Sequence, residues 1–267
     1  MKILILLCLL LSSLALAQAP RPRLMCRFEN GYFKVTDGTQ RWEKYIGTST
    51  NPQVDCGSDF AVGAAGPYFV TFWSGQISEK YIGGNGSNSL LRRGHLAVAM
   101  YDSYLVVARA GGQILQKYVS GTGVPVIEAS SSLAMIIYGS YLLTTDGATI
   151  QEKYVGSTTD PVLSVGRGIG GALLGSYLLV YAGGRVQEKY VGSRGGNDMI
   201  VAGRRAPLIA AAFGSYFQVF DVQRNSFKET YLGTSGRVEV REEGAYHQAP
   251  NGRITRYDLA TGQFSSF

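Results

Sequence analysis

The sequence has little histidine and little cysteine. Its 267 residues include two histidines, His95 and His247, and three cysteines. So few histidines exclude a histidine-rich metal site and leave few general bases. No Gly-x-Ser-x-Gly elbow, phosphate-binding loop or paired-cysteine metal motif is present. We therefore expect no metal, no cofactor and no catalytic residues, although an enzyme remains one of three hypotheses.

Long runs of positive charge are also missing. No run of Lys or Arg exceeds two residues and no recognition motif is present, so we expect no nucleic-acid partner. The 25 basic and 19 acidic residues give a formal net charge of +6. Mild basicity of this kind suits anionic surfaces such as acidic glycans or lipid head groups.

One long apolar run is present, at the N-terminus. Lys2 precedes the run Ile3–Leu16, and Ala15-Leu16-Ala17 forms a small-x-small cleavage site. This pattern predicts a signal peptide over residues 1–17, cleaved after Ala17. The alternative is a membrane anchor, but the run is shorter than the roughly 20 residues that a span needs. We expect a single mature domain over 18–267, secreted or periplasmic, with no transmembrane segment.

Removal of the signal peptide leaves Cys26 and Cys56. Two cysteines in an exported chain are more often paired than free, because the compartment is oxidising. We therefore predict a Cys26–Cys56 disulfide, and two buried thiols are the alternative.

A short phrase recurs six times at a nearly constant spacing. Its tyrosines are separated by 36, 37, 36, 36 and 41 residues. A fixed period of this length indicates one supersecondary unit copied along the chain. The copies are Glu43-Lys44-Tyr45, Glu79-Lys80-Tyr81, Gln116-Lys117-Tyr118, Glu152-Lys153-Tyr154, Glu188-Lys189-Tyr190 and Glu229-Thr230-Tyr231.

Each unit has the sequence features of about four short strands. A second tyrosine lies about 13 residues before the signature tyrosine, as Tyr177 does before Tyr190. The segments around it are rich in Tyr, Val, Leu, Ile and Phe, which favour strands. The 35 glycines interrupt every window with a helical period. Hairpin turns are predicted at Asp37-Gly38, Ser74-Gly75, Gly111-Gly112, Asp146-Gly147, Gly183-Gly184 and Asn225-Ser226.

A seventh, degenerate unit closes the chain. Arg253–Phe264 repeats the strand-turn-strand plan, and Ser265-Ser266-Phe267 stands where the signature would fall. Arg237–Arg241 and Ala245–Ala249 supply its first two strands, whereas Arg23–Phe28 gives the first unit only three clear strands. Seven units are favoured over six, with the last unit completed by the N-terminal strand or left with fewer strands.

Short four-stranded units repeated about seven times predict an all-β fold, a β-propeller. The segment Tyr257–Gly262 resembles the strand-and-turn element of WD-type, kelch-type and quinoprotein-type blades. The resemblance covers one hairpin. The Gly-His and Trp-Asp pair of WD repeats and the double glycine of kelch repeats are missing, so the resemblance implies a generic compact propeller and no particular family. The alternative is an open β-solenoid or a pair of sheets, whose exposed edge strands would need protection that a closed ring supplies.

The signature itself has two interpretations. Alternation places Glu188 and Tyr190 on one sheet face and Lys189 on the other. We therefore predict ion pairs between the Glu of one blade and the Lys of the next, with the tyrosine supplying apolar area between blades. The alternative is a repeated sugar-binding site, in which the tyrosine stacks on a sugar and the charged residues bind its hydroxyls.

A weaker pattern concerns arginines that fall 10 to 15 residues after a signature tyrosine. Because matching loops of a propeller gather at one end, these residues predict a basic face for an anionic partner. They are Arg92, Arg93, Arg167, Arg204, Arg205 and Arg241. Scattered solvated arginines are the alternative.

Taken together, the sequence favours an exported, non-enzymatic binding or scaffolding propeller with a protein or cell-envelope partner. The alternatives are a multivalent, lectin-like propeller and a propeller enzyme with a site in its central channel. The recurring aspartates Asp102, Asp146, Asp221 and Asp258 are interpreted as turn residues.

Overall fold

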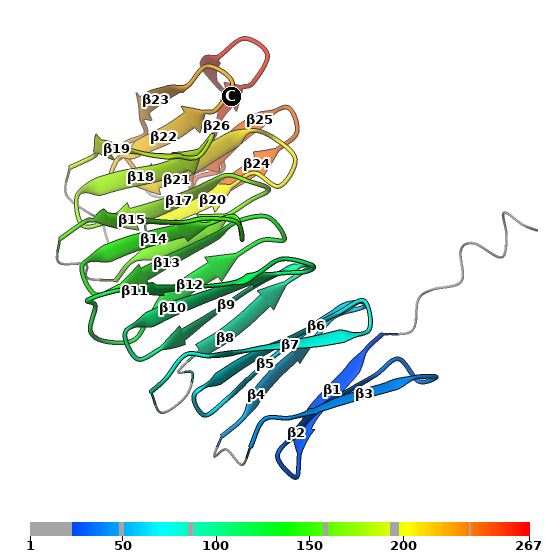
Figure 1. Cartoon of the computed structure of the whole chain (residues 1–267). Helices are drawn as coiled ribbons and strands as arrows, with labels where there is room; N and C mark the ends of the chain where they lie inside the picture. The colour runs from blue at the N-terminus through cyan, green and yellow to red at the C-terminus, as the bar shows by residue number, and fades with distance from the viewer. Residues whose placement is uncertain are drawn as a thin grey trace, which may run out of the picture.

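The computed structural model contains 27 β-strands, and no helix occurs in the part of the chain that it describes. That part comprises residues 23–47, 51–84, 87, 89–156, 160–192, 198–234 and 236–267. The strands form seven antiparallel sheets, which follow one another in chain order (Figure 1). The predicted signal peptide and its cleavage site lie outside the described residues.

The first sheet has three strands and each of the next three has four. Sheet 1 contains β1 (Met25–Glu29), β2 (Tyr32–Thr36) and β3 (Arg41–Tyr45). Sheet 2 contains β4 (Gln53–Cys56), β5 (Phe60–Ala65), β6 (Tyr68–Trp73) and β7 (Gln76–Tyr81). Sheet 3 contains β8 (Ser89–Arg93), β9 (Leu96–Tyr101), β10 (Tyr104–Arg109) and β11 (Ile114–Tyr118). Sheet 4 contains β12 (Val126–Ala129), β13 (Ala134–Tyr138), β14 (Tyr141–Thr145) and β15 (Ile150–Tyr154).

The last three sheets each have four strands. Sheet 5 contains β16 (Val162–Val165), β17 (Gly170–Leu174), β18 (Tyr177–Ala182) and β19 (Arg185–Tyr190). Sheet 6 contains β20 (Met199–Ala202), β21 (Leu208–Phe213), β22 (Tyr216–Asp221) and β23 (Ser226–Tyr231). Sheet 7 contains β24 (Arg237–Arg241), β25 (Gly244–Gln248), β26 (Ile254–Asp258) and β27 (Gln263–Ser266).

The predicted turns connect the last two strands of the first six sheets. At the turn between β6 and β7, Ser74 and Gly75 have φ angles of 48° and 80°. Two successive positive φ angles define the tight hairpin turn whose twist matches that of the flanking strands. The turn therefore brings the start of β6 and the end of β7 together, and pairs Tyr68 with Tyr81.

The core lies between neighbouring sheets. The second strand of several sheets is buried along its whole length, as in β5, β9 and β21. Such strands lack the alternation of a half-exposed sheet because another sheet covers each face. Every sheet except the two at the ends is therefore packed on both sides, as the blades of a propeller are.

The β-propeller class is confirmed, and so is the count of seven blades over six. The first sheet has three strands, as the sequence predicted. The expectation for the last unit was wrong, because β24–β27 form a four-stranded sheet without the N-terminal strand. β1 pairs with β2 inside its own sheet.

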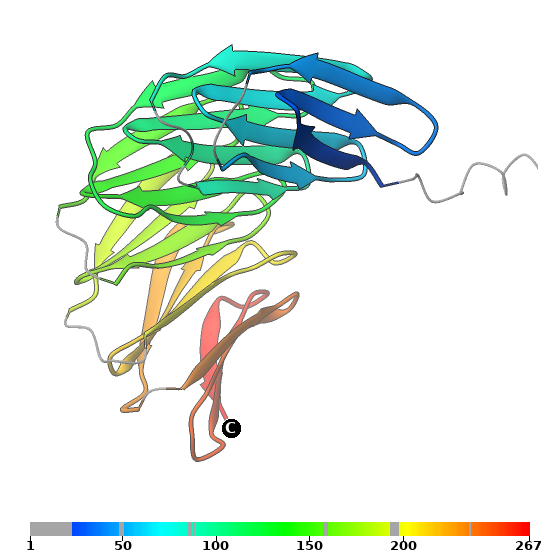
Figure 2. The same ribbon diagram turned by 90° about the horizontal axis from the view of Figure 1, so that it is seen from below.

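The seven sheets form an open arc and do not close into a ring. Sheets 1 and 7 lie at opposite ends of the stack in both views (Figures 1 and 2). Each sheet packs on the next along the chain, chiefly through first strands such as β12, β16 and β20. Within the described ranges, no packed interface joins sheets 1 and 7. The closure expected from the sequence is therefore not present.

Their outer faces explain why the end sheets remain apart. On sheet 1, Glu29 pairs with Arg27 and Lys34. On sheet 7, Arg241 pairs with Glu239 and Arg256 with Asp258. Packing these faces together would remove several ion pairs from water, and the attraction within each pair does not reliably offset the cost of that desolvation.

A search of the described residues for a membrane-spanning helix found none of sufficient length and apolarity.

Candidate binding surface

The signature residues lie along one edge of the arc, where the last strand of each sheet runs beside the last strand of the next. There a lysine of one sheet meets a glutamate of the following sheet, so ion pairs between blades are present but in the reverse order to the predicted one, in which a glutamate faces the lysine of the next blade. The Nζ–Oε distances are 3.3 Å for Lys44–Glu79, 2.9 Å for Lys117–Glu152, 2.8 Å for Lys153–Glu188 and 2.6 Å for Lys189–Glu229. These four ion pairs join neighbouring sheets along the edge.

The ion pair between sheets is missing where the sequence lacks one of the two charged residues, and also where no preceding sheet is present. Sheet 3 carries Gln116 at the glutamate position, and Lys80 instead donates to the carbonyl of Ile114 at 3.0 Å. Glu43 has no preceding sheet to face and pairs with Arg41 in its own strand at 2.8 Å. Thr230 occupies the lysine position of sheet 6, so the row of charges ends before sheet 7.

The signature tyrosines are exposed, which corrects the expectation that they fill space between blades. Their exposed fractions all lie between 60% and 69%. Phe267, at the equivalent position of the seventh unit, is 69% exposed. These seven side chains, which we call the aromatic row, are Tyr45, Tyr81, Tyr118, Tyr154, Tyr190, Tyr231 and Phe267.

Each tyrosine of the aromatic row packs against the first tyrosine of the preceding strand. The six ring pairs have centroid distances of 5.1–5.6 Å and interplanar angles of 64–74°, an edge-to-face arrangement. The next residue in the chain anchors the strand end. The amide of Val119, for example, donates to the carbonyl of Ser103 at 2.7 Å, and the Val119 side chain is buried. The same local structure therefore presents one ring per sheet.

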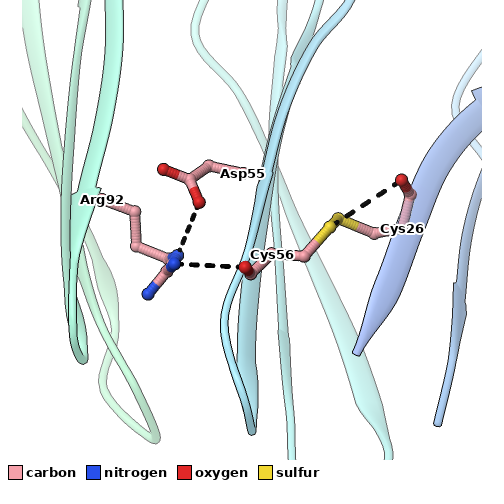
Figure 3. Close-up of a disulfide and its surroundings, with 4 residues drawn as sticks. All are labelled: Cys26, Asp55, Cys56 and Arg92. Carbon is pink, nitrogen blue, oxygen red and sulfur yellow. Dashed lines mark hydrogen bonds and ion pairs between the residues drawn. A yellow bond between two sulfur atoms is a disulfide. The ribbon is translucent and has the colours of Figure 1, made fainter. Parts of the chain in front are cut away.

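The predicted disulfide is present and joins the first two sheets. Cys26 lies on β1 and Cys56 on β4, with a Cα–Cα distance of 6.0 Å (Figure 3). Arg92 of β8 donates to the Asp55 carboxylate at 3.0 Å and to the Cys56 carbonyl at 3.2 Å. Cys56 is thus linked to the sheet on either side.

The six arginines proposed as a basic face all lie at or just after the end of a first strand. Arg92, however, is occupied by Asp55 and Cys56. Arg205 pairs with Glu242 at 2.7 Å, and Arg241 with Glu239 at 3.0 Å. The other three, Arg93, Arg167 and Arg204, are exposed. Carboxylates thus neutralise half of the proposed basic face.

The two histidines have different surroundings. His95 is half exposed and lies 2.9 Å from Asp59 Oδ1. The Ser58 hydroxyl bonds to that same carboxylate oxygen at 3.1 Å. A serine nucleophile would instead bond to the histidine. His247 is buried, its Nε2 has no hydrogen-bond partner, and burial lowers the pKa of His247 below its ordinary value.

A buried polar cluster that the sequence did not reveal joins sheets 6 and 7. The fully buried Asp221 accepts hydrogen bonds from Tyr257 Oη at 2.8 Å and from Arg224 Nη1 at 2.6 Å. Burial alone would raise the pKa of Asp221, but these hydrogen bonds outweigh it and hold the pKa below its ordinary value. Burial, together with the bond to Asp221, raises the pKa of Tyr257 to about 12. Asp221 and Tyr257 are 36 residues apart, which equals the repeat period, and this spacing is the feature of the sequence that could have predicted their contact.

The recurring aspartates also serve as turn residues, as predicted. Asp146 Oδ1 accepts hydrogen bonds from the amides of Ala148 and Thr149 at 2.9 and 3.0 Å. Asp258 Oδ1 accepts one from the amide of Thr261 at 2.9 Å. Within the residues that the structure describes, no three His, Cys, Asp or Glu side chains are grouped as metal ligands.

Two hollows lie between neighbouring sheets, away from the aromatic row. One of about 360 Å³ is lined by both tryptophans of the chain, Trp42 and Trp73, together with Asp37 and Asp59. Trp42 packs on Phe72 of the neighbouring sheet at a centroid distance of 4.8 Å. Trp73 packs on His95 at 5.1 Å. Both tryptophans therefore have packing partners in the next sheet.

No protein-family model matches the chain, and no curated protein matches it in sequence. Solved propeller structures resemble it at low sequence identity. Apo AztD from Citrobacter koseri has 12% identity and a TM-score of 0.41, covering 92% of this chain and 81% of its own. Hsv2p from Kluyveromyces lactis has 10% identity and a TM-score of 0.39, covering 91% and 93%. BamB from Moraxella catarrhalis has 14% identity and a TM-score of 0.39, covering 82% and 76%.

Proposed function

We propose that this protein is an exported, non-enzymatic binding or scaffolding propeller that holds a partner of the cell envelope or cell exterior along its edge. The aromatic row carries this proposal. Aromatic side chains with a polar tip are enriched at interfaces, because they bring large contact area and lose little conformational freedom on binding. Here an exposed tyrosine recurs in each of the first six sheets, and Phe267 takes its place in the seventh.

The charged signature residues fit a supporting role. Glu188 and Lys153 satisfy one another across two sheets, which leaves neither side chain free for a partner. Exposed pairs of this kind contribute about 0.2–1 kcal/mol each, so their main effect is to set the register of the sheets. The lysine–glutamate pairs therefore hold the edge in place, and the rings beside them form the contact surface.

A non-enzymatic role is supported by the surroundings of the two histidines. His95 faces a carboxylate whose second partner is a serine hydroxyl, and His247 is enclosed in the protein. Neither arrangement pairs a general base with a nucleophile.

The test compares two variants of the full-length chain for retention on envelope and secreted material from the organism that encodes it. The first variant replaces Tyr118, Tyr154 and Tyr190 by serine. The matched control replaces the exposed Arg93, Arg167 and Arg204 by serine. We expect the tyrosine variant to lose retention while it keeps its melting temperature, and the arginine variant to be retained like the parent protein.

Equal retention of the parent and the tyrosine variant would contradict the proposal. Loss of retention in the arginine variant alone would move the binding surface to the first-strand turns. Export is tested separately, by N-terminal sequencing of the protein from the culture medium or periplasm. The expected first residue is Gln18.

A further inference from the structure

We infer that the aromatic row is one elongated site for a neutral linear polysaccharide, with a stretch of sugar units against each ring. The inference deepens the proposed function and depends on it, since it names the class of partner that the row holds. Each sheet contributes one subsite, and the order of subsites follows the order of the sheets along the arc. Four observations carry the assignment.

First, the exposed ring recurs where other signature residues do not. The charged positions change to Gln116, Thr230, Ser265 and Ser266, but position 267 still carries an aromatic ring. Phe267 stands opposite Ile254, so it has no tyrosine beneath it, and it is 69% exposed. Packing between two tyrosines is therefore not what the seven positions share. They share an aromatic ring exposed to solvent.

Second, the rings are held before any ligand arrives. The edge-to-face contact with the neighbouring tyrosine covers part of each ring and restricts its rotation. In the pair Tyr141–Tyr154, the centroids are 5.6 Å apart, and Tyr154 is still 69% exposed. A ring that is already ordered loses less conformational entropy on binding, which favours stacking on the apolar face of a sugar.

Third, the charges beside the row cancel. Lys117 with Glu152, Lys153 with Glu188 and Lys189 with Glu229 are paired at 2.9 Å or less, and Glu43 is paired with Arg41. A charged polymer is selected by an unpaired potential of the opposite sign. Because these pairs leave little net charge beside the rings, the site suits an uncharged polymer better than an acidic glycan or a lipid surface.

Fourth, the local structure around each tyrosine of the row repeats from sheet to sheet. The six tyrosine pairs share centroid distances within 0.5 Å of one another, from 5.1 to 5.6 Å. A repeated subsite is best matched by a ligand that presents the same group at each step, as a polysaccharide does and an ordinary polypeptide does not. Linked weak subsites then add through effective concentration, which raises overall affinity by about 100-fold or more.

The experiment measures binding of the purified full-length protein to neutral oligosaccharides by calorimetry. Gluco-, xylo-, manno- and chito-oligosaccharides are each compared as disaccharide and octasaccharide, with alginate as the anionic probe. We expect at least one neutral series to bind, with affinity rising about 100-fold from disaccharide to octasaccharide as more subsites are filled. Added sodium chloride should leave this affinity unchanged, because no charge is recognised.

Two variants test the role of the rings. Replacing Tyr118, Tyr154 and Tyr190 by alanine should reduce octasaccharide affinity at least tenfold, whereas replacing all three by phenylalanine should keep it within about threefold. Both variants should retain the parent melting temperature to within a few degrees. Equal affinity of the alanine variant and the parent protein would overturn the inference.

The outcomes separate this inference from the proposed function. If no neutral oligosaccharide binds but the tyrosine variants still lose envelope retention, the partner is a protein and the inference fails alone. If alginate binds more tightly than every neutral probe and salt weakens it, the inference also fails, and an acidic glycan takes its place. If the tyrosine variants keep envelope retention, the proposed function fails as well.

Discussion

At the residue scale, the lysines and glutamates of the signature act between sheets and not within them. Lys153 and Glu188 belong to successive units, and strand alternation turns them toward each other. Their side chains are partly exposed, at 34% and 52%, so water screens the attraction. Each pair therefore adds little free energy, and the set of pairs acts mainly on the alignment of neighbouring edges.

A double-mutant cycle on Lys153 and Glu188 measures this contribution. Replacing both by glutamine, singly and together, should reveal a coupling free energy of about 0.2–1 kcal/mol in denaturant unfolding. A cycle of Lys80→Gln and Gln116→Ala is the control, since Lys80 donates to the Ile114 carbonyl and faces no glutamate at position 116. Strict additivity at Lys153 and Glu188 would contradict an interaction between the sheets.

His247 gives the stability of the protein a dependence on pH. Its pKa is lowered by burial, so the unfolded chain binds a proton more readily than the folded one below the free value of about 6.5. Stability should therefore fall as the pH drops through 6.5, by at most about 1.4 kcal/mol per pH unit. A glycine at position 236 makes room for the ring, since a Cβ there would lie 2.3 Å from His247 Nε2.

The measurement is the melting temperature between pH 7.5 and pH 5.5. The variant His247→Gln cannot take up the proton, so it should show a smaller fall than the parent protein. His95→Gln is the matched control, because His95 is half exposed beside Asp59. A parent-like fall in the His247 variant would show that other groups set the pH dependence.

At the scale of the elements, sheet 1 is the part of the arc with the fewest strands. It has three strands and one neighbouring sheet, and its outer face is exposed. The Cys26–Cys56 disulfide attaches β1 to β4 and compensates for the missing interface. Removing the bond frees a loop of 30 residues, for which the chain-entropy estimate is about 3–4 kcal/mol.

Replacing both cysteines by serine should therefore loosen sheet 1 without unfolding the other sheets. Limited proteolysis should cut the variant between residues 25 and 56 faster than the parent protein, and leave the remainder intact. Reduction of the parent protein should reproduce the same cut. Proteolysis that instead degraded the whole variant at once would indicate a single cooperative unit.

At the scale of the whole molecule, the arc resembles a stacked-repeat protein more than a closed ring in its energetics. Each sheet contacts its neighbours along the chain, and the two end faces are polar. Tyr246 on the outer face of sheet 7 lies beneath the Arg241 guanidinium at 4.8 Å and the Arg256 guanidinium at 5.7 Å. Polar outer faces are what terminal repeats of such proteins need for solubility.

This arrangement predicts a gradient of local stability. In amide hydrogen exchange, β12–β19 in the middle of the arc should be protected longer than β24–β27 at its end, because end sheets have one neighbour and open first. A closed ring would give every sheet two neighbours and equal protection. Uniform protection from sheet 2 to sheet 7 would therefore contradict the open arc.

Much of the fold was predictable because its determinants are local. Strand boundaries followed from apolar segments and turn residues, and the predicted strand Arg237–Arg241 matches β24 residue for residue. The two-residue period of strands predicted that Glu and Lys face opposite neighbouring sheets, but not that the lysine faces the following sheet, as Lys153 does toward Glu188. The exposure of Tyr154 was not predictable either, because the sequence does not tell how far neighbouring sheets diverge at their edges.

The sequence by itself determined the repeat, the four-stranded units, the turns and the alternation of the signature residues between the two sheet faces, since these depend on spacing and backbone preference. Only the tertiary structure decided that the arc is open, that the aromatic row is exposed and that Asp221 meets Tyr257. Those features depend on the angle between successive sheets. That angle comes from packing across whole faces, to which residues from all four strands of a sheet contribute at once.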